Sequence, residues 1–227
     1  MTDTAVPSLK PVKRRADQDQ KIADQIAADG QYLETVKTDA EILEILAARG
    51  YDAAKLDDGS TLQRDAQAAF TRRQVAMAAQ SRATAGLSGN TATAREMYLD
   101  FRETVRAITD FTASDRAALK AGGVVPDDKQ KMITLARASY QAAQAEPFAS
   151  ILATYGYPPD AIAAALAALD AYAAADTDQN SAIGSAAKAT TDRNAAVTAL
   201  AVYMKQLRGI ARVALRKRPD LLKKLNG

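Results

Sequence analysis

Cysteine, histidine and tryptophan are all absent from this 227-residue sequence. Without cysteine there are no disulfides, no thiolate nucleophiles and no Cys-ligated metals. Without histidine the chain lacks the side chain most often used for acid–base catalysis near neutral pH, which is also the commonest metal ligand. These absences argue against an enzyme, since any activity has to rest on Tyr, Arg, Lys or carboxylate side chains. We therefore expect a non-enzymatic protein without a metal or another cofactor.

Long apolar runs are missing as well. A membrane-spanning helix needs about 18 or more apolar residues in a row, and the most apolar stretch, residues 161–175, is interrupted by Asp170. Residues 1–13 contain neither the apolar segment nor the cleavage signature of a secretory signal. The sequence thus predicts a soluble, cytoplasmic protein with no transmembrane segment.

Alanine dominates what is present. Hydrophobic residues make up 48% of the sequence and aromatic residues only 5%, because alanine supplies a large part of the apolar content. Alanine has the highest helix propensity and lets helix backbones approach closely. We therefore expect an all-α fold with a thin core of Leu, Ile and Ala side chains.

Two segments occur twice, in the same order. Residues 45–51 (ILAARGY) return as residues 151–157 (ILATYGY), a shift of 106 positions. Residues 101–108 (FRETVRAI) return as residues 203–210 (YMKQLRGI), a shift of 102. The two matches indicate a tandem duplication. The predicted architecture is a helical bundle built from two copies of a helical unit of roughly 105 residues.

Three segments follow from this duplication. Residues 1–15 hold two prolines and a cluster of basic residues, and they are predicted to form a basic extended tail. Residues 16–123 form repeat 1, and residues 124–227 form repeat 2 with a basic C-terminus. The stretch Gly122-Gly123-Val124-Val125-Pro126 is the predicted linker between them.

Apolar spacing and capping residues predict the helices of repeat 1. A first helix is expected over about residues 17–37, followed by a short helix that Asp39 caps and Gly50 ends in the left-handed conformation. A long segment comes next. In it, the stretch Gly86-Leu87-Ser88-Gly89-Asn90 has low helix propensity and predicts a loop or a kink.

Repeat 2 has the same order with different boundary residues. A helix is predicted after Asp128, and a short helix is predicted with Pro147 in its first turn and Gly156 at its end. A long helix opens at Pro159 and runs toward Arg216. The middle of this helix, residues 173–196, is rich in small and polar side chains, which indicates either a close helix crossing or a bend.

The recurring pairs Gly50-Tyr51 and Gly156-Tyr157 allow two interpretations. They form either symmetric ligand pockets with tyrosine hydroxyls as polar groups, or helix C-caps in which the residue after glycine packs on the last turn. The C-cap interpretation is favoured, because such caps are the ordinary role of a glycine at a helix end.

Arg106 and Arg208 occupy equivalent positions in the two copies. Two symmetric arginines are suited to binding an anion. The commoner arrangement is pairing with a carboxylate or exposure to solvent.

The segment Asp176-Thr177-Asp178-Gln179-Asn180 resembles the start of a calcium loop, but Ser181 stands where that loop needs glycine, so no metal site is predicted.

Basic residues concentrate at the C-terminal end. Residues 205–227 contain eight basic residues and a single acid, Asp220. Phosphate binding needs several cations on one surface, so a polyanion partner is one interpretation, and helix capping with solubility is the other. The candidate polyanion contacts are Arg208, Arg212, Arg216, Lys217, Arg218 and Lys223.

The final stretch, residues 207–227 (LRGIARVALRKRPDLLKKLNG), resembles the ending of a family of uncharacterised bacterial tandem-repeat α-helical proteins. The resemblance covers most of the chain, through two helical repeats, a Leu-Ala-x-Tyr/Phe-Gly segment and an Ile-Ala-Arg-x-Ala-Leu ending. The first copy departs from that ending, with ITDF at residues 108–111 where the second has IARV at residues 210–213. The resemblance implies the fold and supplies no site.

The predicted function is a non-enzymatic helical scaffold or protein-interaction protein that self-associates, with a second copy or another protein as its partner. The alternative is a module that binds nucleic acid or an anionic membrane through its basic termini. The first hypothesis predicts an oligomer in solution. The second predicts binding that weakens steeply with salt.

Overall fold

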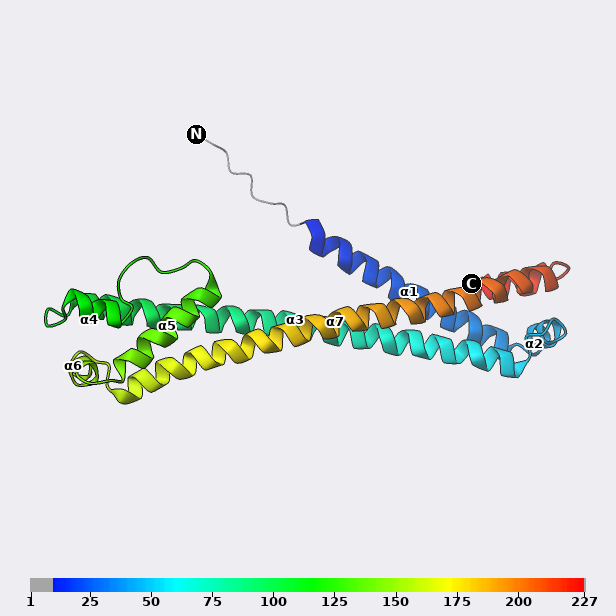
Figure 1. Ribbon diagram of the computed structural model, residues 1–227. Helices are drawn as coiled ribbons and strands as arrows, with labels where there is room; N and C mark the ends of the chain where they lie inside the picture. Colours follow the sequence, from blue (N-terminus) through cyan, green and yellow to red (C-terminus); the bar gives the residue numbers. More distant parts are fainter. Residues whose placement is uncertain (1–9, 227) are drawn as a thin grey trace, which may run out of the picture. The chain divides into compact units, whose positions relative to one another are not determined.

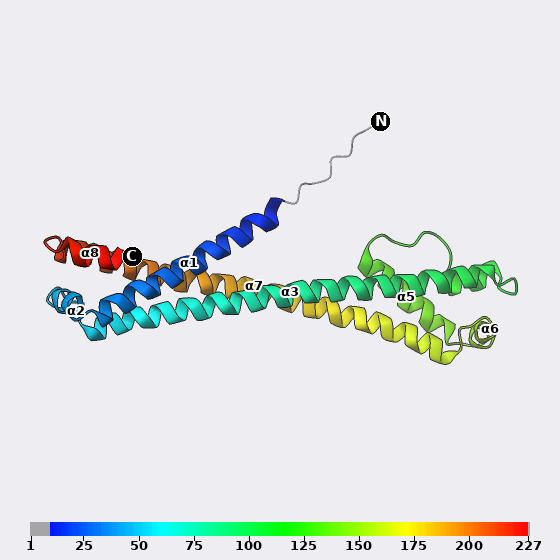
Figure 2. The same cartoon turned by 180° about the vertical axis from the view of Figure 1, so that it is seen from behind.

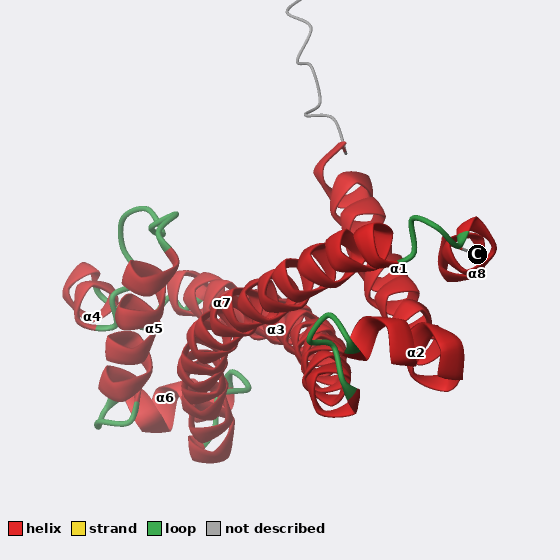
Figure 3. Ribbon diagram, turned by 90° about the vertical axis from the view of Figure 1, so that its right-hand side faces the viewer, coloured by secondary structure: helices red, strands yellow, loops and turns green. Residues whose placement is uncertain are grey.

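The computed structural model describes the backbone of residues 10–226, and within that range it contains eight α-helices and no β-strand (Figures 1 and 3). The predicted all-α class is therefore confirmed. The helices are α1 (Lys10–Thr38), α2 (Ala40–Ala47), α3 (Ala53–Ala107), α4 (Ala113–Ala118), α5 (Lys129–Ala143), α6 (Phe148–Thr154), α7 (Pro159–Ala214) and α8 (Pro219–Asn226).

The chain divides into two compact units. Unit 1 consists of residues 1–76 and 186–227, and unit 2 consists of residues 77–185. Both divisions fall inside the long helices α3 and α7, so each of these helices contributes one part to unit 1 and another to unit 2. Each unit is thus built from both halves of the sequence, whereas the predicted repeats follow the chain.

The order of helices in the first half of the chain occurs again in the second. Helices α1 to α4 contain 29, 8, 55 and 6 residues, and helices α5 to α8 contain 15, 7, 56 and 8. A long helix, a short helix, a very long helix and a second short helix therefore follow one another twice. This is the order that a tandem duplication predicts, and the duplication itself stays a prediction.

Helix α2 begins at the predicted cap, and both α2 and α6 end at the predicted glycines. Asp39 accepts hydrogen bonds from two backbone N–H groups in the first turn of α2, and Gly50 follows the helix with φ +83°. The Tyr51 N–H donates to the Leu46 carbonyl oxygen at 3.0 Å, as in a Schellman motif. Gly156 has φ +89° after α6. Both left-handed helix ends are therefore confirmed.

Two helix starts differ from the prediction. Residues 10–15, which were expected to be extended, are helical because α1 begins at Lys10. Pro11 is compatible with this start, since a proline in the first turn lacks only an N–H that has no partner within the helix. Residues 1–9 of the predicted tail lie outside the described residues. Pro147 is the N-cap residue of α6 and precedes its first turn.

The predicted loop at residues 86–90 is wrong, because α3 runs through them without interruption. Leu87 is buried in the core of unit 2, and Asn90 Nδ2 donates to the Ala171 carbonyl oxygen of α7 at 3.2 Å. These contacts outweigh the low helix propensity of the two glycines, which costs about 1 kcal/mol each. Helix α7 is likewise continuous, and a Cβ added at Gly184 would meet no described atom within 4 Å.

Unit 1 has one apolar core, to which α1, α2, α8 and parts of α3 and α7 contribute. Helix α1 contacts both α2 and α8 (Figure 2). The Tyr51 ring meets the Tyr203 ring edge to face, with centroids 6.0 Å apart. Position 59 has to be glycine, because a Cβ on Gly59 would lie 2.4 Å from the Tyr203 ring. Helix α8 completes the core by burying Leu221 and Leu225.

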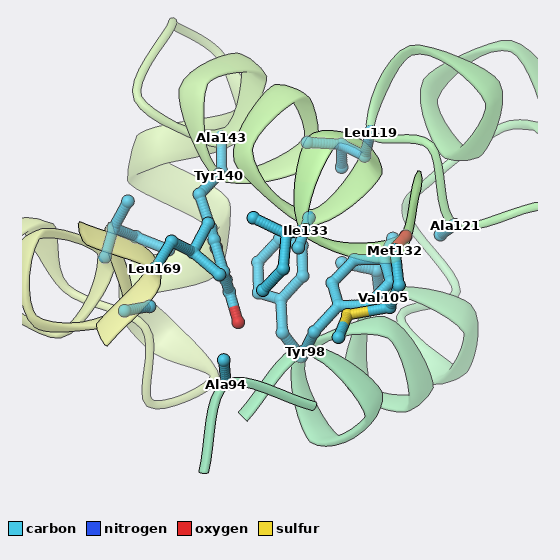
Figure 4. Close-up of a cluster of buried hydrophobic side chains, with 14 of the residues drawn as sticks. Ala94, Tyr98, Val105, Leu119, Ala121, Met132, Ile133, Tyr140, Ala143 and Leu169 are labelled. Carbon is cyan, nitrogen blue, oxygen red and sulfur yellow. The ribbon is translucent and has the colours of Figure 1, made fainter. Parts of the chain in front are cut away.

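Unit 2 has a separate apolar core, shown in Figure 4. The Tyr140 ring of α5 lies edge to face with Tyr98 of α3, with centroids 6.3 Å apart, and its centroid is 5.0 Å from that of Phe101. Tyr157, which follows the glycine that ends α6, meets Phe101 edge to face at 5.1 Å. Other buried side chains of this core are Ala94, Val105, Leu119, Met132, Ile133 and Leu169.

Candidate functional site: the basic face of α7 and α8

The predicted polyanion contacts lie on the last part of α7, on α8 and on the turn between these helices, all within unit 1. We call the surface formed by the basic side chains of this segment the basic face. Lys205 and Arg212 share one side of α7, because a seven-residue spacing is close to two full turns. The basic face consists of Lys205, Arg208, Arg212, Arg216, Lys217, Arg218, Lys223 and Lys224.

Arg208 is paired with a buried carboxylate. Its Nη2 donates to Asp29 Oδ1 of α1 at 2.8 Å, and Asp29 is only 2% exposed. The guanidinium also lies over the Tyr32 ring, 5.0 Å from its centroid, in a cation–π arrangement. Burial raises the pKa of Tyr32, and the charge of Arg208 opposes this rise. Arg208 therefore joins α7 to α1.

Arg218 and Lys224 are paired as well. Arg218 contacts Glu41 at the start of α2 and lies 2.7 Å from Asp220. Lys224 Nζ donates to Asp39 Oδ2 at 2.5 Å. The hydrogen bond from Lys224 lowers the pKa of Asp39, and the one from Arg218 lowers the pKa of Asp220. These contacts join α8 and the preceding turn to α2, and they neutralise two cations of the basic face.

The other five cations of the basic face are exposed, and none has a hydrogen bond or an ion pair to another side chain in the described part of the chain. They are Lys205, Arg212, Arg216, Lys217 and Lys223. Lys205 and Arg212 also line, together with Arg208, a cleft of about 510 Å³ between α1 and α7. A second cleft of about 720 Å³, lined by α1, α7 and α8, shares Arg208. The basic face thus carries positive charge without an acidic partner in the described chain, beside a cleft whose lining includes Lys205 and Arg212.

Arg106, the predicted equivalent of Arg208, has different partners and belongs to unit 2. Its guanidinium donates to the carbonyl oxygens of Ala121 at 2.7 Å and Gly123 at 3.0 Å. Arg102, one turn earlier on α3, donates to the same Ala121 oxygen at 3.0 Å. Arg102 is buried, which lowers its pKa. Both arginines hold the linker between the predicted repeats, since Arg102 also donates to the Gly122 carbonyl oxygen at 2.9 Å.

The tyrosines of the two Gly-Tyr pairs are packing residues. The Tyr51 side chain is buried, and its hydroxyl has no hydrogen-bond partner among the described residues. The Tyr157 hydroxyl donates to Asp100 Oδ2 at 2.6 Å. Burial, reinforced by this hydrogen bond to a carboxylate, raises the pKa of Tyr157 to about 12. The geometry of both pairs agrees with the favoured interpretation as helix ends.

A second buried ionic cluster was not predicted. Asp19 of α1 accepts hydrogen bonds from Arg73 of α3 at 2.7 Å and from Arg193 of α7 at 3.3 Å, and both arginines are buried. Burial lowers the pKa of Arg193, and the neighbouring charge of Arg73 lowers it further. The burial of the other acid, Asp29, is foreseeable from the sequence, because Asp29 lies on the same helical stripe as the apolar residues Ile26 and Leu33. Asp19 gives no comparable signal.

Comparison with protein-family models, with curated proteins and with solved structures found no significant match to this chain. The resemblance of its C-terminal segment to a bacterial helical-repeat family therefore stays a prediction. None of the described helices combines the length and apolarity needed to cross a membrane. Over the same described range, no group of three or more acidic side chains is arranged to hold a metal ion.

Proposed function

We propose that this chain is a non-enzymatic α-helical scaffold that associates with further copies of itself. The observation that carries the proposal is a separation of charge between the compact units. By sequence, unit 1 contains 21 Lys and Arg against 15 Asp and Glu, whereas unit 2 contains 9 against 12. Surfaces of opposite charge attract one another and orient the encounter of two molecules.

The proposal includes an origin by tandem duplication. Equivalent residues of the two repeats make equivalent contacts, each across the two halves of the chain. Tyr51 of repeat 1 packs edge to face on Tyr203 of repeat 2, and Tyr157 of repeat 2 packs edge to face on Phe101 of repeat 1. The interplanar angles are 75° and 85°. A module that already packs against its own copy is a natural source of symmetric assemblies.

Light scattering coupled to size-exclusion chromatography tests the proposal. The full chain is expected to run as a dimer or larger species at low ionic strength and to dissociate as salt rises toward about 0.5 M, where surface charges are screened within a few ångströms. Deletion of residues 1–15 checks whether the N-terminal basic segment takes part. A monomer at every protein concentration, with or without salt, rejects self-association.

Binding of a polyanion is the second candidate function, and the five unpaired cations of the basic face favour it. The matched test substitutes glutamate for Arg212, Arg216 and Lys217 but keeps Arg218, because Arg218 contacts Glu41 and Asp220 within the fold. If the chain binds nucleic acid or anionic vesicles, the triple variant loses that binding and the wild-type affinity falls steeply with salt. Unchanged binding by the triple variant rejects the basic face as the contact.

A further inference from the structure

The predicted repeats carry opposite charges at equivalent exposed positions. With the shift of 102 that relates Phe101 to Tyr203, Glu103 corresponds to Lys205 and Asp110 corresponds to Arg212. The same shift relates Leu119 to Leu221, and both of these side chains are buried in their units. The correspondence therefore extends through the whole charged segment. Neutral substitution of surface residues gives no reason for both exposed positions to reverse their charge between the repeats.

All four charged side chains are free to meet a partner. Glu103 lies in the last turns of α3 and Asp110 lies in the turn after it, both in unit 2. Lys205 and Arg212 lie on α7 in unit 1. Each is exposed and makes no side-chain hydrogen bond or ion pair with another described residue.

A third pair of equivalent positions also carries opposite charges, but its acidic side chain has a partner within the fold. Lys217 corresponds to Asp115, but Asp115 accepts from the Thr112 N–H and belongs to the capping box of α4. That carboxylate has a role within the fold. Glu103 and Asp110 make no such contact within the described chain, so their charge is available to a second molecule.

Residues near each pair add acidic charge on the acidic side and exposed apolar surface on the basic side. On α3, Glu96 and Asp100 share the side of Glu103, because they precede it by seven and three residues. On α7, Val202 and Val213 flank the cationic positions and are 64% and 63% exposed. An interface built on Lys205 and Arg212 therefore includes apolar surface to bury as well as charge.

We infer that Lys205 and Arg212 of one copy bind Glu103 and Asp110 of a second copy, so that unit 1 of one molecule docks on unit 2 of the next. This inference rests on the proposed function and names its contact surfaces. In both pairs the two charges are seven residues apart, which on α7 corresponds to about 10 Å along the helix axis. The contact joins two different surfaces, so two copies close it reciprocally as a two-fold dimer, or further copies extend it into a ring or a filament. A nucleic acid would use the cations alone and gives no reason for Glu103 and Asp110 to be acidic.

Charge exchange tests the contact. Lys205→Glu with Arg212→Glu reverses the basic side, and Glu103→Lys with Asp110→Lys reverses the acidic side. Each double variant is expected to weaken association at low salt by roughly tenfold or more, because two attractive pairs become repulsive. The quadruple variant restores both attractions with the signs exchanged, and it is expected to associate within a few-fold of the wild type. An equimolar mixture of the two double variants is expected to form mixed assemblies.

Control variants carry the same change of charge at exposed positions that have no partner. Arg49→Glu with Arg72→Glu matches the basic reversal, and Asp127→Lys with Asp178→Lys matches the acidic reversal. Both controls are expected to associate like the wild type, and circular dichroism verifies that every variant keeps its helicity. A loss of association in the controls equal to that in the test variants overturns the inference, because net charge alone then governs assembly.

The outcomes separate this inference from the proposed function. If the wild type is monomeric under all conditions, self-association fails and the inference fails with it. If the wild type assembles and reversal of either side leaves association unchanged, the scaffold proposal stands and this contact is overturned. The contact is also overturned if the quadruple variant is as weak as the double variants. Recovery in the quadruple variant, together with mixed assemblies, supports it.

Discussion

Tyr203 of α7 donates its hydroxyl hydrogen to the Lys55 carbonyl oxygen in the first turns of α3, at a distance of 2.6 Å. The two residues are 148 positions apart in the sequence. The hydrogen bond joins the two predicted repeats within unit 1, beside the edge-to-face contact of the same tyrosine with Tyr51. It satisfies a buried hydroxyl, whereas the Tyr51 hydroxyl is buried without a partner in the described structure.

This difference predicts opposite effects of removing the two hydroxyls. Tyr203→Phe is expected to lower the free energy of unfolding by about 1 kcal/mol, because the hydrogen bond from its hydroxyl to the Lys55 carbonyl oxygen is lost. Tyr51→Phe is expected to be neutral or slightly stabilising, because it removes a polar group that is buried without a partner. Urea unfolding at neutral pH measures both. Equal losses in the two variants contradict the described pairing.

Glycine replacement tests the continuity of α3. Gly86→Ala with Gly89→Ala is expected to raise the free energy of unfolding by about 1 to 2 kcal/mol, because both residues are exposed within a helix and an added Cβ meets no described atom. Gly59→Ala is the contrasting variant. It is expected to destabilise, because its Cβ would lie 2.4 Å from the Tyr203 ring. A loss of stability in the Gly86 and Gly89 variant indicates that residues 86–90 leave the helix.

The pair of Arg208 and Asp29 is expected to respond unequally to the loss of each partner. Arg208→Ala leaves the 2% exposed carboxylate of Asp29 without a counter-charge and is expected to cost about 2 kcal/mol. Asp29→Asn leaves a half-exposed guanidinium that water solvates, and it is expected to cost about 1 kcal/mol. Thermal or urea unfolding provides the comparison. A larger loss in Asp29→Asn would contradict the burial of the carboxylate.

Tyrosine burial predicts a loss of stability in alkali. Burial raises the pKa of Tyr157 and of Tyr203 from 10 to about 12 in the folded state, and it also raises the pKa of Tyr140. Between these values the folded chain binds more protons than the unfolded chain, so the free energy of unfolding falls as pH rises from about 10 toward 12. Urea titrations across this range measure the slope.

Two matched variants, Tyr157→Phe and Tyr155→Phe, test which tyrosine causes the slope of the free energy of unfolding against pH in alkali. The first removes the hydroxyl of a half-buried tyrosine whose pKa is raised, and it is expected to reduce the slope. The second removes an exposed hydroxyl, since Tyr155 is 46% exposed, and is expected to leave the slope as it is. A slope that does not differ between these variants shows that the packing of Tyr157 does not govern the alkaline transition.

Local sequence signals predicted the local structure well. Asp39, Gly50 and Gly156 mark helix ends through hydrogen bonds and backbone angles that depend on a few neighbouring residues. The segment from Gly86 to Asn90 is helical despite its low helix propensity, because α7 contacts it from more than 80 positions away in sequence. Local propensity carries no information about such partners.

The candidate site shows the same limit. The basic residues at the end of the chain are evident from the sequence, but which of them are neutralised depends on acids far away in the chain. Arg208 is paired with Asp29 at a separation of 179 positions, and Lys224 with Asp39 at 185. Only the folded arrangement distinguishes these cations from Lys205 and Arg212, which are exposed and have no acidic partner in the described chain.

The division into compact units also sets an order for folding during synthesis. Unit 2 is one continuous stretch, residues 77–185, so all of its segments are synthesised before the second part of unit 1. Unit 1 joins the beginning of the chain to its last 42 residues, 186–227. The core of unit 1 that α1 and α2 enter is therefore complete only after α7 and α8 have been synthesised. Residues 10–76 are therefore synthesised well before residues 186–226, which complete the core around them.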